Sequence, residues 1–173
     1  MGAVTLALAV QCLVVYQLLL FVFTRLNPLR FLKKFSPVMM FAFTTATSNA
    51  TIPLSIDTLD KKIGVSKKIS SFTIPLGATI NMDGTSIMQG VAVIFIAQVY
   101  GMELTPAQLL TVIATAMIAS IGTAGIPSVG LIMLAMVLTS VGLPTEGIAL
   151  IMGIDRILDM LRTAVNITGD AVC

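Results

Sequence analysis

Six polar or charged side chains recur at helical spacing in the last apolar stretch of this 173-residue chain. The spacing places all six on one face of a helix, and Arg156 lies one position off that face. The six are Asp155, Asp159, Arg162, Thr163, Asn166 and Asp170. They could bind a charged ligand, or pair with one another, as Asp159 and Arg162 could. Three acids, an arginine and an asparagine exceed what packing needs, which favours a ligand site.

Two further stretches, 81–85 and 120–127, combine polar residues with glycine and favour local unwinding of a helix. The first reads Asn-Met-Asp-Gly-Thr and follows Gly-Ala-Thr at 77–79. Unwound carbonyl groups and the Asp83 carboxylate are hard oxygen ligands of the kind that a small cation prefers. The alternative is a flexible kink with a buried acid. The glycines of the second stretch also suit a moving gate.

Composition places these stretches inside a membrane. Hydrophobic residues make up 57% of the chain and charged residues 10%, whereas a soluble domain has about 25% charged residues. Each ionisable group at the centre of a membrane helix costs about 2.5–3.5 kcal/mol on insertion scales, so the polar face must contact protein, water or a ligand. A net charge of +2 gives no reason to expect a nucleic-acid partner.

The basic residues indicate how the chain enters the membrane. Eight of the ten fall in two clusters, at 25–34 and 61–68, which the positive-inside rule places in the cytoplasm. The apolar runs between the clusters are too short to span a bilayer. The chain between them is therefore expected to form a re-entrant hairpin, with its tip in the polar run 44–51.

The second half of the chain repeats this order from the opposite side. The loops at 101–106 and 140–147 carry an acid each and no base, so both are expected outside, and the segment between them is expected to be re-entrant. A hairpin and a span, repeated with inverted topology, are typical of secondary transporters. We therefore predict an all-α integral membrane protein with two re-entrant hairpins and three spans. The five segments are 1–26, 27–66, 67–103, 104–141 and 142–173.

Three long motifs resemble the dicarboxylate/amino acid:cation symporters, a family that includes the excitatory amino-acid transporters. They are PLGATINMDGT at 75–85, ASIGTAGIPSVG at 119–130 and GIDRILDMLRTAVNITGD at 153–170. The resemblance covers essentially the whole chain. It implies a sodium-coupled symporter of acidic amino acids or C4-dicarboxylates in a cell membrane, and not an enzyme. In the family, such hairpins and broken spans form a transport domain that moves like an elevator against a trimeric scaffold.

The resemblance also implies two or three sodium sites. One would combine main-chain carbonyls and a carboxylate from Gly77, Asn81, Asn166 and Asp170. A second would use the carbonyls of Thr79, Ser120, Ile121 and Thr123. A third would use Asp83 and the Asn81 side chain, with partners on an earlier helix of the family that this chain lacks.

The substrate site implied by the resemblance lies beside these ions. Asp159 would bind an amino group, and Arg162 with Thr85 a side-chain carboxylate. The main-chain carboxylate would contact Asn166 and the first hairpin tip, at Ser48 and Asn49. Other residues would line the same pocket, namely Thr163, Met82 and Gly130.

Two positions depart from the family pattern. An archaeal member has an arginine where Ala46 stands, and other members place an arginine near Met160, but this chain has neither. Arg156, one turn before Met160, is our hypothesis for the missing positive charge, and Arg156→Ala should then weaken binding of acidic substrates. The chain is also expected to be a fragment, from the family's sixth helix into its eighth. Scaffold helices and two further copies would be its partners.

Other functions fit the residues less well. A symporter of neutral amino acids or cystine, or one coupled to protons, stays open, although Arg162 favours a second carboxylate on the substrate. An intramembrane aspartyl protease could use two aspartates, but the chain lacks the glycine two residues before Gly169 that such enzymes use. A passive channel would not need Asp159 and Arg162 side by side.

Overall fold

The computed structural model describes residues 2–121 and 127–173, which form helices and turns with no strand among them. This confirms the predicted all-α class. In chain order the elements are α1 (Gly2–Val10), η1 (Gln11–Val15), α2 (Tyr16–Thr24), α3 (Pro28–Thr45), α4 (Ser48–Thr58), η2 (Leu59–Ile63), α5 (Lys67–Ile80), α6 (Asp83–Val99), α7 (Pro106–Ile121), α8 (Val129–Ser140), η3 (Thr145–Ile148) and α9 (Ala149–Val172).

Two helical segments of the described chain are long and apolar enough to cross a membrane, where the sequence predicts three spans. The first is Gly2–Thr24, in which the π-helical turn η1 joins α1 to α2. The second is Lys67–Val99, in which α5 and α6 follow one another across a break at Asn81 and Met82. With 24 residues, α9 is long enough, but five of them are charged and apolarity alone does not identify it.

Helices α3 and α4 form the first hairpin. Pro28 begins α3, and the Asn27 side chain accepts hydrogen bonds from the amides of Leu29 and Arg30, so the otherwise unpaired amides of the first turn are satisfied. The turn at the other end is made by Ala46, which has φ of +51° and whose amide donates to the Ala42 carbonyl at 2.8 Å. The tip therefore lies within the polar run from which it is predicted.

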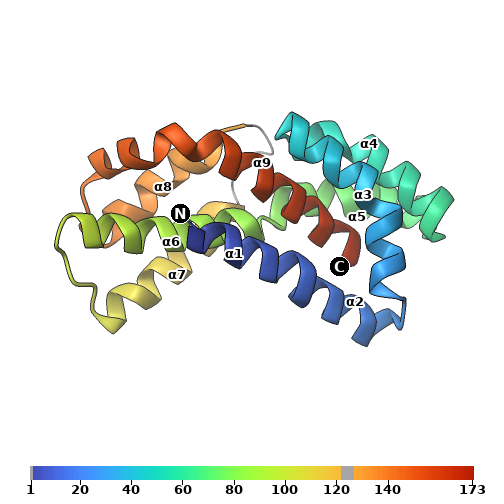
Figure 1. Cartoon of the computed structure of the whole chain (residues 1–173), viewed down its shortest axis with the longest axis horizontal. Helices are drawn as coiled ribbons and strands as arrows, with labels where there is room; N and C mark the ends of the chain where they lie inside the picture. Colours follow the sequence, from blue (N-terminus) through green and yellow to red (C-terminus); the bar gives the residue numbers. More distant parts are fainter. Residues whose placement is uncertain (1, 122–126) are drawn as a thin grey trace.

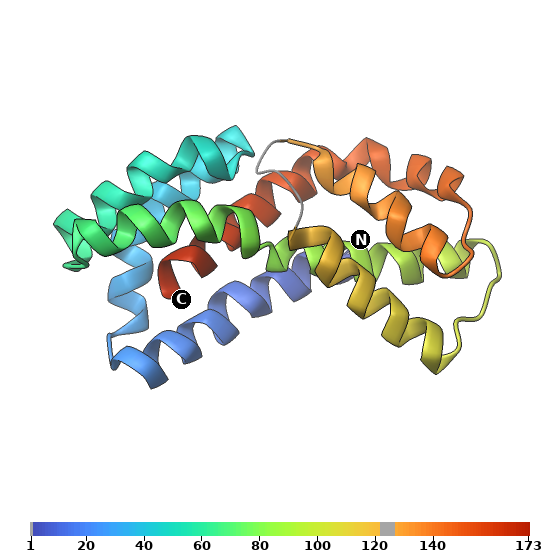
Figure 2. The same ribbon diagram turned by 180° about the vertical axis from the view of Figure 1, so that it is seen from behind.

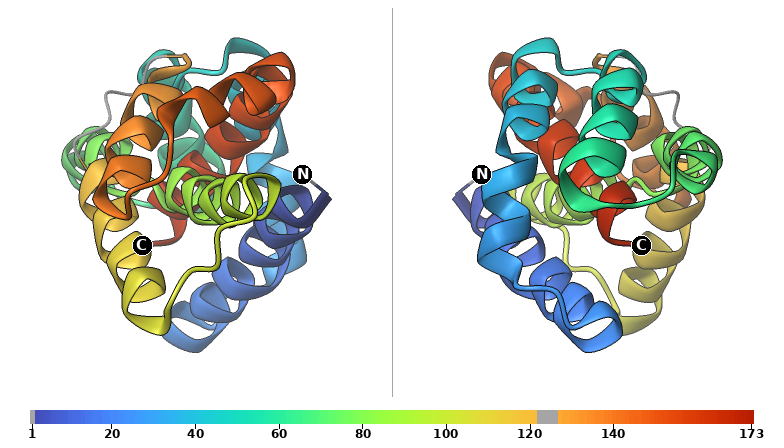
Figure 3. Two further views of the ribbon diagram at one scale, coloured as in Figure 1. Left: turned by 90° about the vertical axis from the view of Figure 1, so that its left-hand side faces the viewer. Right: turned by 90° about the vertical axis from the view of Figure 1, so that its right-hand side faces the viewer.

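Helices α7 and α8 form the second hairpin, and α9 crosses the molecule between the two hairpins. The α7–α8 hairpin lies at one end and the α3–α4 hairpin at the other (Figure 1), and the reverse view shows the same division (Figure 2). Helix α9 packs against α3, α5 and α6. The end views show the Gly2–Thr24 helix along one side of the bundle (Figure 3).

The apolar core has two parts, and α9 contributes to both. The larger part joins α1, α6, α7, α8 and α9 around side chains such as Met88, Leu134 and Ile151. The smaller part joins α2, α3, α5 and α9 around Phe35 and Ile167, among others. Because α9 presents apolar side chains to both parts, its polar face is held between them.

Candidate functional site

The structure buries the polar face of α9. All six residues of the predicted stripe are less than 9% exposed, and Arg162 is 1% exposed. Arg156 is exposed and is not brought to this face. The helical periodicity therefore identifies six of the seven buried polar side chains of α9; it misses Thr168, and Arg156 lies outside the buried face.

Arg162 is held by two aspartates of its own helix. Its Nη2 donates to Asp155 Oδ1 at 3.2 Å and to Asp159 Oδ1 at 3.0 Å. The pairing of Asp159 with Arg162 that the spacing allows is thus present. However, Nη1 and Nε of Arg162 are buried without a hydrogen-bond partner among the described residues. Pairing therefore leaves the donors of Nη1 and Nε without a partner; they lie on different sides of the guanidinium, and each can donate to a ligand oxygen.

Gly130, at the start of α8, lies directly beside Arg162 Nη1. A Cβ atom on Gly130 would collide with Arg162 Nη1, so only glycine leaves room for the guanidinium here. Ser128, two residues before Gly130, donates its amide to Asp159 Oδ2 at 2.9 Å. Asp159 thus contacts both the arginine and the beginning of the second hairpin's returning helix.

The break between α5 and α6 meets α9 at Asn166. The Asn166 Oδ1 accepts a hydrogen bond from the Gly84 amide at 2.8 Å. Its Nδ2 donates to Met82 Sδ at 3.2 Å and to Thr85 Oγ1 at 3.5 Å. Three residues predicted to bind ions or substrate therefore lie together: Met82, Thr85 and Asn166. A fourth, Asn81, is the neighbour of Met82 in the chain.

Asp170, one turn beyond Asn166, lies beside the same break. Its Oδ1 accepts a hydrogen bond from Asn81 Nδ2 at 3.0 Å, and its Oδ2 is buried with no hydrogen-bond partner among the described residues. A Cβ atom on Gly77 would lie 2.8 Å from Asp170 Oδ1, so α5 approaches the carboxylate closely. A buried, unpartnered carboxylate oxygen beside an interrupted helix fits a small hard cation such as sodium.

Asp83 forms a third polar contact, with residues that the sequence patterns did not identify. Its Oδ2 accepts hydrogen bonds from Gln11 Nε2 and Tyr16 OH, each at 3.0 Å. Both donors belong to the first helix, where they are polar groups in a long apolar run. That exception to the apolar pattern is the sequence signal that could have identified them. Asp155 is also part of the site, since it accepts a hydrogen bond from Arg162. The sequence predicted its position on the polar face but gave it no role.

Acidic, histidine and cysteine side chains do not gather into a transition-metal site in the described part of the chain. The polar centres instead combine single carboxylates with amides, hydroxyls and main-chain carbonyls. That donor set suits alkali cations and zwitterionic ligands better than zinc or iron.

Comparison with known proteins gives the family. The profile of the sodium:dicarboxylate symporter family matches residues 1–173. The chain belongs to this family. It is 44% identical over 165 residues to an excitatory amino acid transporter of Caenorhabditis elegans, covering 95% of this chain and 33% of that protein.

Mammalian proteins are similarly close to this symporter-family chain. It is 43% identical over 171 residues to excitatory amino acid transporter 3 of Mus musculus, covering 99% of this chain and 33% of the relative. It is 45% identical over 169 residues to excitatory amino acid transporter 1 of Homo sapiens, covering 98% and 31%. The chain thus spans about a third of the length of these relatives. Membership of this family confirms the resemblance drawn from the sequence, and the family's members are transporters and not enzymes.

The remaining residues expected from the symporter family are placed less uniformly. Ser48 is buried at the start of α4, whereas Asn49 beside it is exposed. The Thr163 hydroxyl is buried and donates to the Asp159 carbonyl at 2.8 Å.

The expected second sodium site is only partly brought together. Ser120 accepts a hydrogen bond from the Ser86 hydroxyl at 2.7 Å, so α6 and α7 meet there. Thr79 and Ile121 are exposed, and no hydrogen bond between described residues links them to Ser120. Thr123 lies outside the described residues.

Proposed function

We propose that the chain forms the transport domain of a sodium-coupled symporter for acidic amino acids or C4-dicarboxylates. The observation that supports this most is Arg162, which is buried, anchored through Nη2 and unpartnered at Nη1 and Nε. Nη1 and Nε of a guanidinium fixed in this way remain available as charged donors to a carboxylate oxygen. A neutral amino acid has no second carboxylate for them, so leaving these donors unpaired disfavours it.

The substrate would lie between α9, the α5–α6 break and the two hairpin tips. Arg162 and Thr85 bind its side-chain carboxylate, and Asp159 binds its amino group. Its main-chain carboxylate contacts Asn166, whose amide already joins Met82 to Thr85. The first hairpin contributes Ser48 and Asn49, while Thr163, Met82 and Gly130 line the pocket.

Sodium ions are proposed substrates at the neighbouring carboxylates. The first site combines Asp170 with the carbonyls of Gly77, Asn81 and Asn166, and the unpartnered Asp170 Oδ2 supports it. The second lies among the carbonyls of Thr79, Ser120, Ile121 and Thr123. The third is at Asp83 and the Asn81 side chain, and Gln11 and Tyr16 are the partners of Asp83 in this chain.

Asn81 and Asn166 give a physical route for coupling. Asn81 donates to Asp170, and it adjoins Met82, which contacts Asn166 on the substrate side. An ion beside Asp170 would hold the α5–α6 break in the conformation that presents Met82 and Thr85. Substrate binding would stabilise the same conformation, so each ligand favours the other through that one state.

We also propose the membrane arrangement and the partners. The segments 27–66 and 104–141 form re-entrant hairpins of opposite orientation, and 1–26, 67–103 and 142–173 cross the bilayer, the last with its charges facing the protein interior. Scaffold helices in a homotrimer would support the domain while it moves like an elevator between the two sides of the membrane.

A binding titration tests the function. The purified protein is titrated with aspartate, glutamate, succinate and a neutral amino acid such as alanine, each with sodium and with choline as the replacement cation. We expect binding of the three acidic ligands that depends on sodium, and little binding of alanine. Equal binding of alanine would contradict the role of Arg162, and equal binding in choline would contradict sodium coupling.

A further inference from the structure

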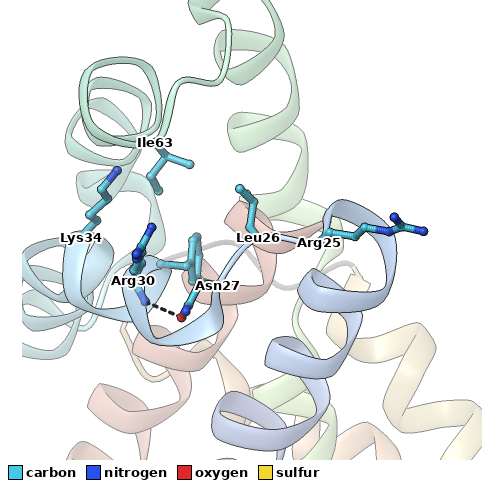
Figure 4. Close-up of a pocket in the computed structure, with 7 residues that line it drawn as sticks. Arg25, Leu26, Asn27, Arg30, Lys34 and Ile63 are labelled. Atoms are coloured by element: carbon cyan, nitrogen blue, oxygen red, sulfur yellow. Dashed lines mark hydrogen bonds between the residues drawn. The ribbon is translucent and has the colours of Figure 1, made fainter.

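A basic cavity lies at the junction of α2 and α3, and no residue of the polar centres described above lines it. Its volume is about 330 Å³, and its lining includes Arg25, Arg30 and Lys34 but no acidic residue. Arg30 and Lys34 extend from α3 toward the side where Ile63 lies, while the Arg25 guanidinium points away from both (Figure 4). Two cations, one helical turn apart, therefore share one side of this cavity.

The positive charge of the cavity is not balanced by the protein. Arg30 and Lys34 are four residues apart on a helix, where like charges repel each other. None of the ion pairs between described residues includes Arg25, Arg30 or Lys34. The Lys34 ammonium donates to the Lys62 carbonyl at 2.5 Å, and a neutral carbonyl leaves its charge uncompensated. The cavity therefore suits an anion.

The surroundings of the cavity are those of a membrane interface. The apolar Gly2–Thr24 helix ends immediately before Arg25, and Phe21 and Phe23 in its last turn are 55% and 80% exposed. Leu26 and Ile63 line the cavity beside the cations. Basic side chains at the cytoplasmic end of an apolar helix lie at the depth of lipid headgroups. A phosphate joined to an acyl chain would match both the charge and the apolar surface.

We propose that this cavity binds the phosphate group of an anionic phospholipid from the cytoplasmic leaflet. Arg30 and Lys34 bind the phosphate oxygens, and the acyl chains lie along the exposed apolar side chains at the end of α2. The site is separate from the proposed substrate and sodium sites. A lipid bound there would contact the end of α2 through its acyl chains and the first hairpin through its phosphate. Arg30 lies on α3, and Ile63 ends η2, which follows α4.

The test measures binding of fluorescent phosphatidylglycerol to the detergent-purified protein, with phosphatidylcholine as the neutral lipid. Each cation removed should weaken binding about fivefold, so the double variant Arg30→Gln and Lys34→Gln should bind roughly 25-fold more weakly. The matched control is Lys67→Gln with Lys68→Gln, which removes the same charge at the start of α5, outside the cavity. The control should bind phosphatidylglycerol almost as the unchanged protein does.

Thermal unfolding in the same detergent separates lost binding from lost folding. Phosphatidylglycerol should raise the unfolding temperature of the unchanged protein and the control but not of the double variant, which should unfold at an unaltered or higher temperature without lipid. An equal loss of binding in both variants would show a general basic surface and overturn the site. Equal binding of phosphatidylcholine, or full competition by inorganic phosphate, would overturn the assignment to an anionic lipid.

Discussion

Two groups of polar residues, one around Arg162 and one around Asp170 and Asp83, differ in the charge of the partners that the protein gives them. Around Arg162 the chain supplies a cation with two acids, and the guanidinium still has unpartnered donors. Around Asp170 and Asp83 it supplies two carboxylates whose partners, Asn81, Gln11 and Tyr16, are all neutral. The first centre therefore keeps free donors for one carboxylate beside two acids that can hold an amino group, and the second has carboxylates that can receive cations. Arg162 and Asp170 lie about two turns apart on α9, while Asp83 begins α6. This closeness is what the proposed coupling uses.

The largest effect should follow from removing the cation of the first centre. Arg162→Ala leaves Asp155 and Asp159 buried without a counter-charge and removes the donors to the substrate. Losing one partner of a buried, hydrogen-bonded charge pair costs binding about 2–5 kcal/mol, so aspartate affinity should fall by about two orders of magnitude. Isothermal titration measures it. Arg162→Lys keeps the charge without the planar fork; if it bound aspartate normally, recognition by a guanidinium would be wrong.

Removing a carboxylate of the second centre should affect both ligands. Asp170→Asn removes the negative charge beside Gly77, so sodium affinity should fall, and aspartate affinity should fall with it by about 5- to 150-fold. Titrations of sodium at several aspartate concentrations measure the two together. Asp57→Asn, at an exposed acid paired with Lys61, is the control and should change neither. A loss confined to one ligand would show that the two centres are not coupled.

A smaller effect should follow from filling the space beside Arg162. Gly130→Ala places a methyl group against Arg162 Nη1 and forces the guanidinium to move, at about 1–3 kcal/mol. Aspartate affinity should drop roughly tenfold or more while sodium binding without substrate is retained. Gly153→Ala, also in a helix but with open space around it, is the control. Equal aspartate affinities in the two variants would contradict the close contact.

A smaller effect should follow from a change in the first helix, at the hydrogen bond between Tyr16 and Asp83. Tyr16→Phe removes the hydroxyl that donates to Asp83 and keeps the ring in the core, so sodium affinity should fall, but by less than about tenfold because Gln11 still donates to Asp83. Sodium titration of the unfolding temperature measures it. Tyr100→Phe, at a half-exposed ring, should leave sodium binding unaltered. Identical behaviour of the two variants would remove Tyr16 from the site.

The smallest effect should come from Arg156. Because its side chain is exposed and lies off the polar face, Arg156→Ala should change aspartate affinity by less than about threefold, as expected for a screened surface charge. Titration with aspartate at low salt gives the most sensitive measurement. A sharp loss would support the hypothesis, drawn from the sequence, that Arg156 supplies a positive charge to the substrate.

Local patterns predicted the parts of the site that lie within one element. Helical periodicity identified six of the seven buried polar residues of α9, and Asn and Gly around Asp83 indicated where the second span is interrupted. Contacts between distant segments were not predictable in this way. Gln11 and Tyr16 are 72 and 67 residues from Asp83, and no local spacing indicates that they meet it.

Pairing rules for neighbouring helical turns also have a limited range. They predicted Asp159 with Arg162 but not Asp155, which lies seven residues away and reaches the same nitrogen because arginine is long. Apolarity likewise identified two of the three predicted spans, since the charges that serve the site make α9 unlike an ordinary membrane helix.

The charges of α9 have a consequence for how the protein enters the membrane during synthesis. Five ionisable residues at about 2.5–3.5 kcal/mol each would oppose insertion of this helix on its own. The surfaces that stabilise its polar face belong to α3, α5, α6 and α8, which are all synthesised earlier. We therefore expect α9 to insert only as it packs against those helices, so that mutations weakening this packing would reduce the yield of inserted protein before they alter any affinity.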